Sequence, residues 1–420
     1  MESVKKSEVY QPFIYIVTAL LYTIRVSLFG GLLDNLITRG LFILFFALSF
    51  YYFVKANQLV DKNRICRCLN ILVGLVLVYG VLFVIVGTDT TWLRPTSPFF
   101  FLYSYLGSIF PIYAFYYFGR EGWIDEEWFK RMTLLFIVFV VYSFINKRNV
   151  TMELQDNAEE ITNNASYMVL SLFPVLAFLK KKPIVFYALI LVAFLLIISG
   201  GKRGAILLGV VCLVYSLFKM NQGIKNWQKI IVFVSFAAVV YLAWVYFNDM
   251  LQNSDRFNKR VMELAEGSAS NREDMYPRYF AFFLNSNVFQ FIFGHGADGT
   301  CHYLGLMAHN DWLEMSINMG LIGFFSLLAY WINVFKTWIM SRSQIEAEVV
   351  MAMGMFIIIY FGKTLFSMSI MNMTIVATSV FGYCLAVYDD YLESEYEYDE
   401  YEYDEEEYEY DEESDTSFIA

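Results

Sequence analysis

Long apolar runs recur along the whole of this 420-residue chain. Hydrophobic residues make up 58% of it, which is more than soluble globular domains of ordinary composition contain. A helix that crosses the hydrocarbon core of a bilayer needs about 20 apolar residues, and about twelve runs approach that length. They cover residues 13–29, 41–54, 69–86, 99–118, 132–145, 165–179, 184–198, 205–218, 230–247, 312–335, 349–366 and 369–388. The sequence therefore predicts an all-α polytopic membrane protein.

The basic residues divide the connecting segments into two classes. Every second loop carries at least two lysines or arginines, and the series begins with Lys5 and Lys6. Because cytoplasmic loops are enriched in these residues, both termini are expected in the cytoplasm. Four segments follow: transmembrane helices in 1–247, one large extracytoplasmic loop in 248–310, further transmembrane helices in 311–388, and a tail in 389–420.

The tail explains the acidic charge of the chain. Residues 389–415 are almost all Glu, Asp and Tyr, and they outweigh the formal net charge of −11. A low-complexity segment that repels itself is expected to be disordered. The net charge therefore says little about partners, and no feature of the chain indicates nucleic-acid binding.

One short outward loop departs from the charge pattern. It reads Ser-Gly-Gly-Lys-Arg-Gly over 199–204 and sets Lys202 and Arg203 on the side where topology requires no basic residue. One explanation is an interfacial anchor that reaches to lipid headgroups. The other is an anion site, because a guanidinium keeps its charge and grips phosphate oxygens in pairs.

The large loop supplies a second cationic group. Ser270 and Glu273 have the spacing of a capping box, which predicts that a helix starts there. Arg272 then lies in the first turn of this helix, where the helix dipole favours acidic residues. The presence of an arginine there needs another explanation. Arg278 is turned about 120° away on a continuous helix. Both arginines can face one ligand only if Pro277 breaks the helix, and we favour Arg272 with Arg278 as its substitute.

The three histidines of the chain are evenly spaced, at positions 295, 302 and 309. On one helix this spacing would separate neighbours by about 10.5 Å, too far to share a zinc ion, so no metal and no other cofactor is predicted. His309 precedes Asn310 and a second capping-box pattern, Asp311 with Glu314, which we expect to open a span. An imidazole at that position can act as a general base or donate to phosphate.

These motifs together resemble a known family. Gly-Lys-Arg-Gly at the head of a span, an outward loop with Ser-x-Arg, Gly-His-Gly-x-x-Gly, a His-Asn pair, and Leu-Glu running to Gly-Leu-Ile-Gly look like the O-antigen ligase/polymerase superfamily of bacterial surface-polysaccharide enzymes. The specific resemblance covers residues 199–325. It implies a fold similar to that of membrane-embedded C-type glycosyltransferases and an inverting, metal-independent glycosyl transfer.

The resemblance also implies site residues and partners. Arg203 and Arg272 or Arg278 would grip the diphosphate of a glycan donor carried on undecaprenyl diphosphate. His309 would assist deprotonation of the acceptor hydroxyl or stabilise the leaving diphosphate. The catalytic candidates are therefore His309, Arg203 and Arg272. The substrate-binding candidates are Lys202, Arg278, His295 and Asn310. The enzyme would lie in a bacterial inner membrane with its active site facing the periplasm or cell exterior. A glycan acceptor, a flippase and a chain-length regulator of the same pathway would be its partners.

Three functions are weighed on this basis. The first is a polymerase that joins lipid-linked repeat units into O-antigen or capsular polysaccharide. The second is a ligase that moves finished glycan to lipid A-core or another acceptor. The third is a transporter or flippase, which we disfavour because transporters place ionisable groups at mid-membrane and show repeated halves. Here the conspicuous polar residues collect outside the spans.

Overall fold

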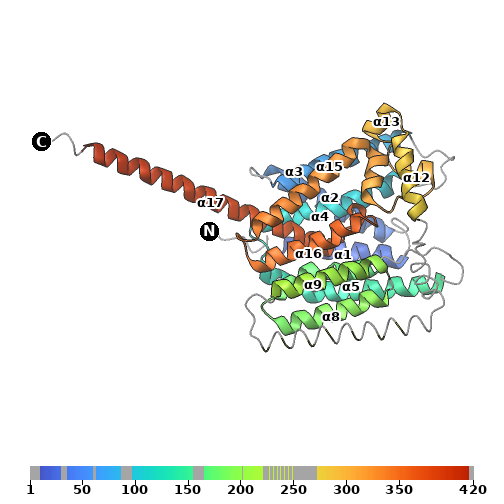
Figure 1. The fold of residues 1–420 in the computed structure, drawn as a ribbon, viewed down its shortest axis with the longest axis horizontal. Helices are drawn as coiled ribbons and strands as arrows, with labels where there is room; N and C mark the ends of the chain where they lie inside the picture. Colours follow the sequence, from blue (N-terminus) through green and yellow to red (C-terminus); the bar gives the residue numbers. More distant parts are fainter. Residues whose placement is uncertain are drawn as a thin grey trace.

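The computed structural model describes residues 10–29, 36–59, 63–86, 97–154, 165–200, 202–220 and 272–415, with isolated positions between 227 and 248. Within these ranges, side chains are described except at 25–29, 147–154, 272–273 and 396–415. Every regular element in the described part of the chain is a helix (Figure 1). The predicted all-α class is therefore confirmed.

The long helices coincide with the predicted apolar runs. They are α1 Gln11–Phe29, α2 Leu36–Gln58, α3 Arg64–Val86, α4 Pro98–Arg120, α5 Glu126–Leu154, α8 Pro183–Ser199, α9 Arg203–Met220, α15 Asp311–Ser341, α16 Ala347–Thr364 and α17 Ile375–Asp415. The run at 165–179 forms three short pieces, α6 Ala165–Leu170, α7 Leu172–Leu176 and the 3₁₀ turn η1 Ala177–Leu179. The run at 230–247 lies outside the described residues apart from isolated positions.

By length and composition, seven helical segments of the described chain can cross a membrane. They are α2, α3, α4, Glu126–Asn146 of α5, α9, α15 and α16. Three shorter apolar segments, Gln11–Ile24, Ala165–Leu179 and Pro183–Ser199, accompany them. This supports a polytopic membrane protein, while the total of twelve spans stays a prediction. α5 also continues to Leu154, beyond the apolar run expected at 132–145.

Helix α4 lies at the centre of the bundle and packs against α2, α3 and α17. Small residues let α4 and α17 approach closely, as in many membrane bundles. A β-carbon on Gly119 would lie 2.5 Å from that of Ala386, and one on Gly382 would overlap the carbonyl of Ile112. The α4–α17 contact therefore depends on glycine at both positions.

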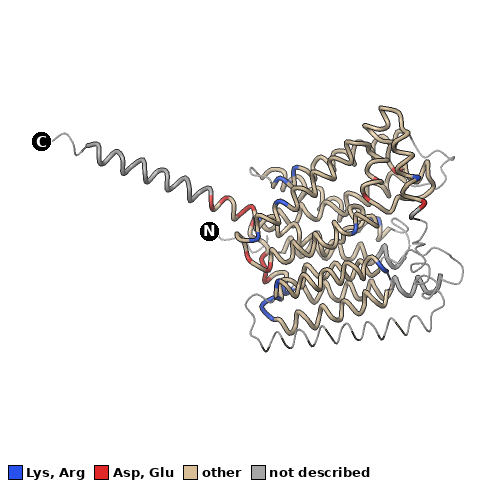
Figure 2. The backbone as a smooth tube through the Cα atoms, viewed as in Figure 1, with Lys and Arg blue, Asp and Glu red and all other residues tan. Residues whose placement is uncertain are grey.

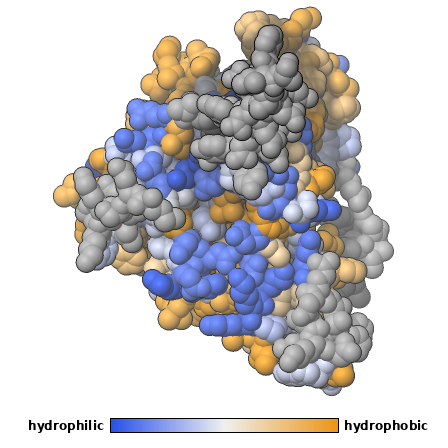
Figure 3. Space-filling view, turned by 90° about the vertical axis from the view of Figure 1, so that its left-hand side faces the viewer, coloured by the Kyte–Doolittle hydropathy of each residue, from blue (hydrophilic) through white to orange (hydrophobic). Residues whose placement is uncertain are grey.

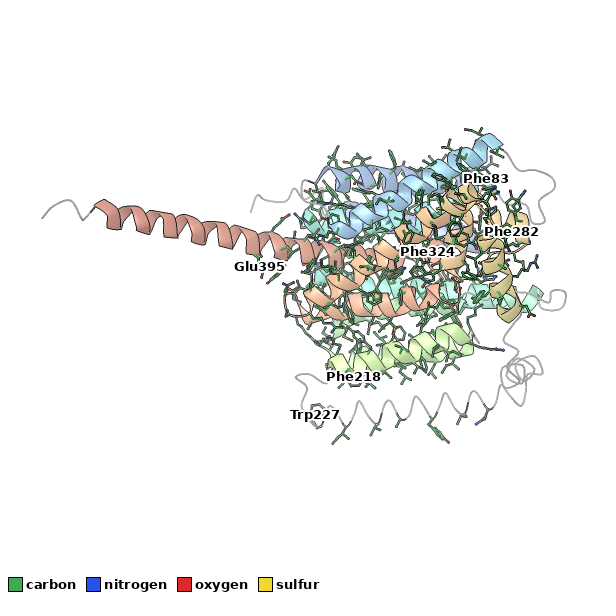
Figure 4. The ribbon with its side chains drawn as sticks, turned by 45° about the horizontal axis from the view of Figure 1, so that its top comes forward. Phe83, Phe218, Trp227, Phe282, Phe324 and Glu395 are labelled. Atoms are coloured by element: carbon green, nitrogen blue, oxygen red, sulfur yellow. The ribbon has the colours of Figure 1, made fainter. Side chains whose placement is uncertain are left out.

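The bundle has two distinct ends (Figures 1 and 4). One end is marked by Phe83 of α3 and by Phe282 of α12 (Arg272–Leu284), and we call it the α12 end. It also carries two short helices, α13 (Val288–Phe293) and α14 (Gly299–Leu304). Phe218 of α9 and Glu395 of α17 mark the other, the tail end. Lys and Arg gather mainly at the tail end (Figure 2), whose face is largely hydrophilic between apolar flanks (Figure 3).

Acidic residues of α17 bind the tail end of the bundle. The Asp389 carboxylate accepts hydrogen bonds of 2.6 Å from both Asn63 and Tyr116. Arg120 of α4 forms an ion pair of 3.1 Å with Asp390 and a second pair with Glu393. These contacts fix α17 where it leaves the bundle.

Helix α17 runs into the acidic segment for which the sequence predicted disorder. α17 is one helix as far as Asp415, so most of the acidic segment is helical. Adding residues to an existing helix avoids the cost of nucleation, and α17 starts from a packed, buried segment.

Candidate active site at the α12 end

Helix α15 is broken near its start. Gly320 has φ 65° and ψ −159°, so α15 consists of two helical segments on either side of it. The carbonyls of Ile317 and Asn318, just before the break, accept hydrogen bonds from the backbone N–H groups of His295 (2.7 Å) and Gly296 (3.1 Å). The strap formed by residues 294–296 thus supplies donors to carbonyls at a helix end, which would otherwise lack partners.

Only glycine fits where the strap meets the break. Gly294 has φ 79°, and a β-carbon there would lie 2.5 Å from the backbone nitrogen of Gly320. A β-carbon on Gly320 would in turn lie 2.5 Å from the nitrogen of Gly294. The glycines of two separate sequence motifs, Gly-His-Gly-x-x-Gly and Gly-Leu-Ile-Gly, therefore pack against each other.

The N-cap of α15 is Asn310. Its side-chain oxygen accepts from the N–H of Leu313 at 3.1 Å, and its amide nitrogen donates to the carbonyl of Leu365 at 3.1 Å. The predicted capping box of Asp311 with Glu314 is wrong, because the cap lies one residue earlier. Asn310 does cap the helix, and it also ties α15 to the segment that follows α16.

Asp311 holds that same segment from the inside. It is only 2% exposed, and its carboxylate accepts from the N–H groups of Ser369 (2.9 and 3.0 Å) and Ile370 (3.0 Å). A buried carboxylate needs such donors, because an unpaired one is costly. Asp311 therefore joins α15 to residues 369–370 and does not cap the helix.

Glu314 likewise anchors the loop that carries His309. The side chain is fully buried and accepts hydrogen bonds from Thr300 (2.6 Å), Asn318 (2.9 Å) and the N–H of Ala308 (2.8 Å). Ala308 directly precedes His309. Glu314 thus joins α14, α15 and the histidine loop around one carboxylate.

His309 is held in an unusual backbone conformation. Its φ is 50°, in the left-handed region that non-glycine residues seldom occupy. Its carbonyl accepts from the hydroxyl of Tyr276 at 3.2 Å, and Tyr279 donates to the carbonyl of Leu306 at 2.7 Å. Burial raises the pKa of Tyr279 to about 12, so this phenol stays protonated as a donor. Two tyrosines of α12 therefore clamp the loop that presents His309.

Helix α12 carries both predicted arginines, Arg272 and Arg278. It is continuous from Arg272 to Leu284, so Pro277 does not break it. Positions 272 and 278 are consequently turned about 120° apart on this helix. The Arg278 side chain is exposed, and that of Arg272 lies outside the described side chains. The expected N-cap, Ser270, lies outside the described residues.

The basic turn 202–203 reaches the same end of the bundle. Arg203 is the first residue of α9 and is half-buried, as is Lys202 before it. A β-carbon on Gly204 would overlap both the Tyr167 hydroxyl and the Phe366 ring. Phe366 follows Leu365, whose carbonyl receives the side chain of Asn310. The segment 365–366 therefore connects the Arg203 turn with the His309 loop.

A buried cation that was not among the predicted site residues lies beside this connection. Lys363, near the end of α16, is 3% exposed, and its Nζ lies 4.9 Å from the ring centroid of Tyr167. It donates to the carbonyl of Asn372 at 3.4 Å. The available signal was an ionisable residue inside an apolar run, which in membrane proteins often marks function.

His295 lies in an aromatic cluster with Phe282 and Tyr303. Its Nε2 is 2.7 Å from Ser286 Oγ, and its ring centroid is 4.5 Å from that of Phe282. Burial lowers the pKa of His295. Within the described part of the chain, no three His, Cys, Asp or Glu residues are arranged to hold a metal ion.

Comparison with known families agrees with the motifs. Residues 186–328 match a family model described as O-antigen ligase, which confirms the resemblance. The match runs from α8 into α15 and so contains the Arg203 turn, α12, the strap and the His309 loop. No curated protein matches the chain.

Proposed function

We propose that this chain, which carries an O-antigen ligase family domain over residues 186–328, is a membrane polysaccharide polymerase. It would join oligosaccharide repeat units carried on undecaprenyl diphosphate into O-antigen or capsular polysaccharide. The observation that carries the proposal is the family match over the segment in which the Arg203 turn and the His309 loop meet through residues 365–366.

The chemistry is an inverting displacement at the anomeric carbon of the donor sugar. The acceptor oxygen forms the new glycosidic bond while the bond from carbon to phosphate oxygen breaks. The acceptor proton passes to the imidazole of His309, and the lipid diphosphate leaves with the bonding electrons. Arg203, with Arg272 or Arg278, stabilises the charge that develops on the leaving diphosphate. Lys202, His295 and Asn310 remain candidates for substrate binding.

The basic residues suggest how the protein is oriented in the membrane. Cytoplasmic segments are enriched in Lys and Arg, and these gather at the tail end (Figure 2). The α12 end would therefore face the periplasm or cell exterior of a bacterial inner membrane, with twelve spans and both termini in the cytoplasm. The glycan acceptor, a flippase and a chain-length regulator would meet the enzyme there.

A ligase is the second candidate, because the matching family model is described as O-antigen ligase. It would move a finished glycan from the same lipid diphosphate to lipid A-core or another acceptor. The donor side of the site would be unchanged. Only the acceptor distinguishes the two activities.

Purified protein in lipid nanodiscs separates the candidates. We would supply a lipid-linked repeat unit alone, and then a lipid-linked polymer with lipid A-core, and resolve the products on gels. A ladder from the repeat unit alone supports the polymerase. Transfer to lipid A-core without a ladder supports the ligase, and movement of lipid-linked sugar between leaflets without any new bond would reject both.

A further inference from the structure

Helix α13 turns an apolar face away from the protein. Val288 is 77% exposed and Phe289 70%, and Ile292 and Phe293 are also exposed. At 100° per residue these four side chains share one side of the helix. Its other side packs inward, where the ring of Phe291 stacks on Phe283 with centroids 4.7 Å apart. An exposed apolar patch of this kind indicates an interaction surface.

The depth of α13 follows from its contact with α3. The Tyr79 hydroxyl donates to the carbonyl of Phe293, the last residue of α13. α3 is a candidate span that continues from Tyr79 to Val86, a further rise of about 10 Å at about 1.5 Å per residue. Its last residues, Val84 to Val86, are apolar and exposed at the α12 end. α13 therefore ends about two helical turns below the outward end of a lipid-facing helix.

The backbone around α13 forms the hydrogen bonds that a position inside the membrane requires. Irregular backbone is tolerated in a membrane only where its polar groups are satisfied. Gly294 N–H donates to the carbonyl of Gln290 at 2.7 Å, and the N–H groups of His295 and Gly296 bind the broken end of α15. The start of α13 is capped by Asn287, which accepts from the N–H of Gln290 at 2.9 Å.

We propose that α13 is a re-entrant helix inserted in the outward leaflet, with lipid acyl chains covering Val288, Phe289, Ile292 and Phe293. α3, which Tyr79 joins to α13, also exposes apolar side chains near this contact, which argues for lipid rather than a protein partner. Through the turn at 285–287, the insertion anchors α12 above the membrane, where Tyr276 and Tyr279 hold the histidine loop. The inference concerns lipid contact and does not depend on which glycosyl transfer is catalysed.

Photo-crosslinking in the full-length protein tests it. Benzoylphenylalanine would replace Phe289, or Ile292 in a second variant, and the protein would be reconstituted in vesicles of phosphatidylethanolamine and phosphatidylglycerol. The matched control replaces Asp274, an exposed polar residue of α12. Mass spectrometry after irradiation would count acyl-chain adducts at each position.

We expect acyl adducts at Phe289 and Ile292 to exceed those at Asp274 by about tenfold or more, because an apolar side chain strongly favours hydrocarbon over water. Equal and low yields at all three positions would overturn the proposal. So would adducts at Phe289 to a second protein chain in place of lipid. Folding of each variant is checked by gel filtration and melting temperature before irradiation.

Discussion

Gly294 and Gly320 pack so closely that a β-carbon on either would lie 2.5 Å from the backbone nitrogen of the other. Both residues have positive φ, 79° and 65° respectively. Gly294 belongs to the strap after α13, and Gly320 marks the break in α15. The contact joins α13 and its strap to α15, a candidate membrane helix.

Gly320→Ala should destabilise the protein. The left-handed backbone and the overlap with the carbonyl of Ile292 both penalise a side chain, by about 2 kcal/mol or more in total. Thermal melting in detergent checks this. The matched control is Gly74→Ala on α3, where a β-carbon meets nothing within 4 Å and melting should change little. Equal melting temperatures for the two variants would contradict the account of the junction.

Glu314→Gln should also lower stability, although it preserves size. The carboxylate accepts three hydrogen bonds, and the amide puts a donor where one acceptor oxygen stood. Leaving one buried partner unpaired costs about 1–3 kcal/mol. Glu346→Gln, at an exposed position before α16, is the control. Unchanged melting of the Glu314 variant would show that the network contributes nothing.

Arg203→Ala should abolish glycosyl transfer while the protein still folds. Removing one preorganised cation from a developing anion costs about 100-fold or more in rate. Arg203→Lys should restore part of the rate, since lysine keeps the charge and loses the paired hydrogen bonds. Lys219→Ala, near the opposite end of α9, serves as the control. Full activity of Arg203→Ala in the nanodisc assay would reject the diphosphate site.

His309→Ala should reduce the transfer rate by about 10²–10⁴-fold, the contribution of general acid–base catalysis, because the imidazole takes the acceptor proton. A loss below that range would limit His309 to orienting the acceptor. The rate is measured at saturating donor while the acceptor concentration is varied. His302→Ala on α14 is the control, and an equal loss in that variant would point to a general structural effect.

Stability should fall at acidic pH through His295. Burial lowers the pKa of this imidazole, so the folded state favours its neutral form. The stabilising effect is fully present above the ordinary histidine pKa of about 6.5 and is lost as pH falls through the folded value. Melting temperatures measured from pH 7.5 downwards should drop less for His295→Asn than for the unchanged protein. Parallel curves would place the acid sensitivity elsewhere.

Local sequence patterns predicted the helices well. Eleven of the expected apolar runs fall on helical segments of the described chain, because hydrophobic length alone specifies a membrane helix. Motif order also predicted the family of residues 186–328. Capping was harder to predict: Asn310, Asp311 and Glu314 are all suitable near a helix start, and only their partners in other segments distinguish them.

By itself, the sequence determined that this chain forms apolar helices, because that property depends on composition and local spacing. It also predicted that two separate polar segments, the turn with Arg203 and the loop with Arg272 and His309, lie on the outward side. Only the tertiary structure decided which residues meet. It brought the Arg203 turn and the His309 loop to one segment, buried Lys363 beside it, and closed Gly294 on Gly320. The reason is physical: contacts between residues far apart in the chain depend on how the helices pack, which no local pattern records.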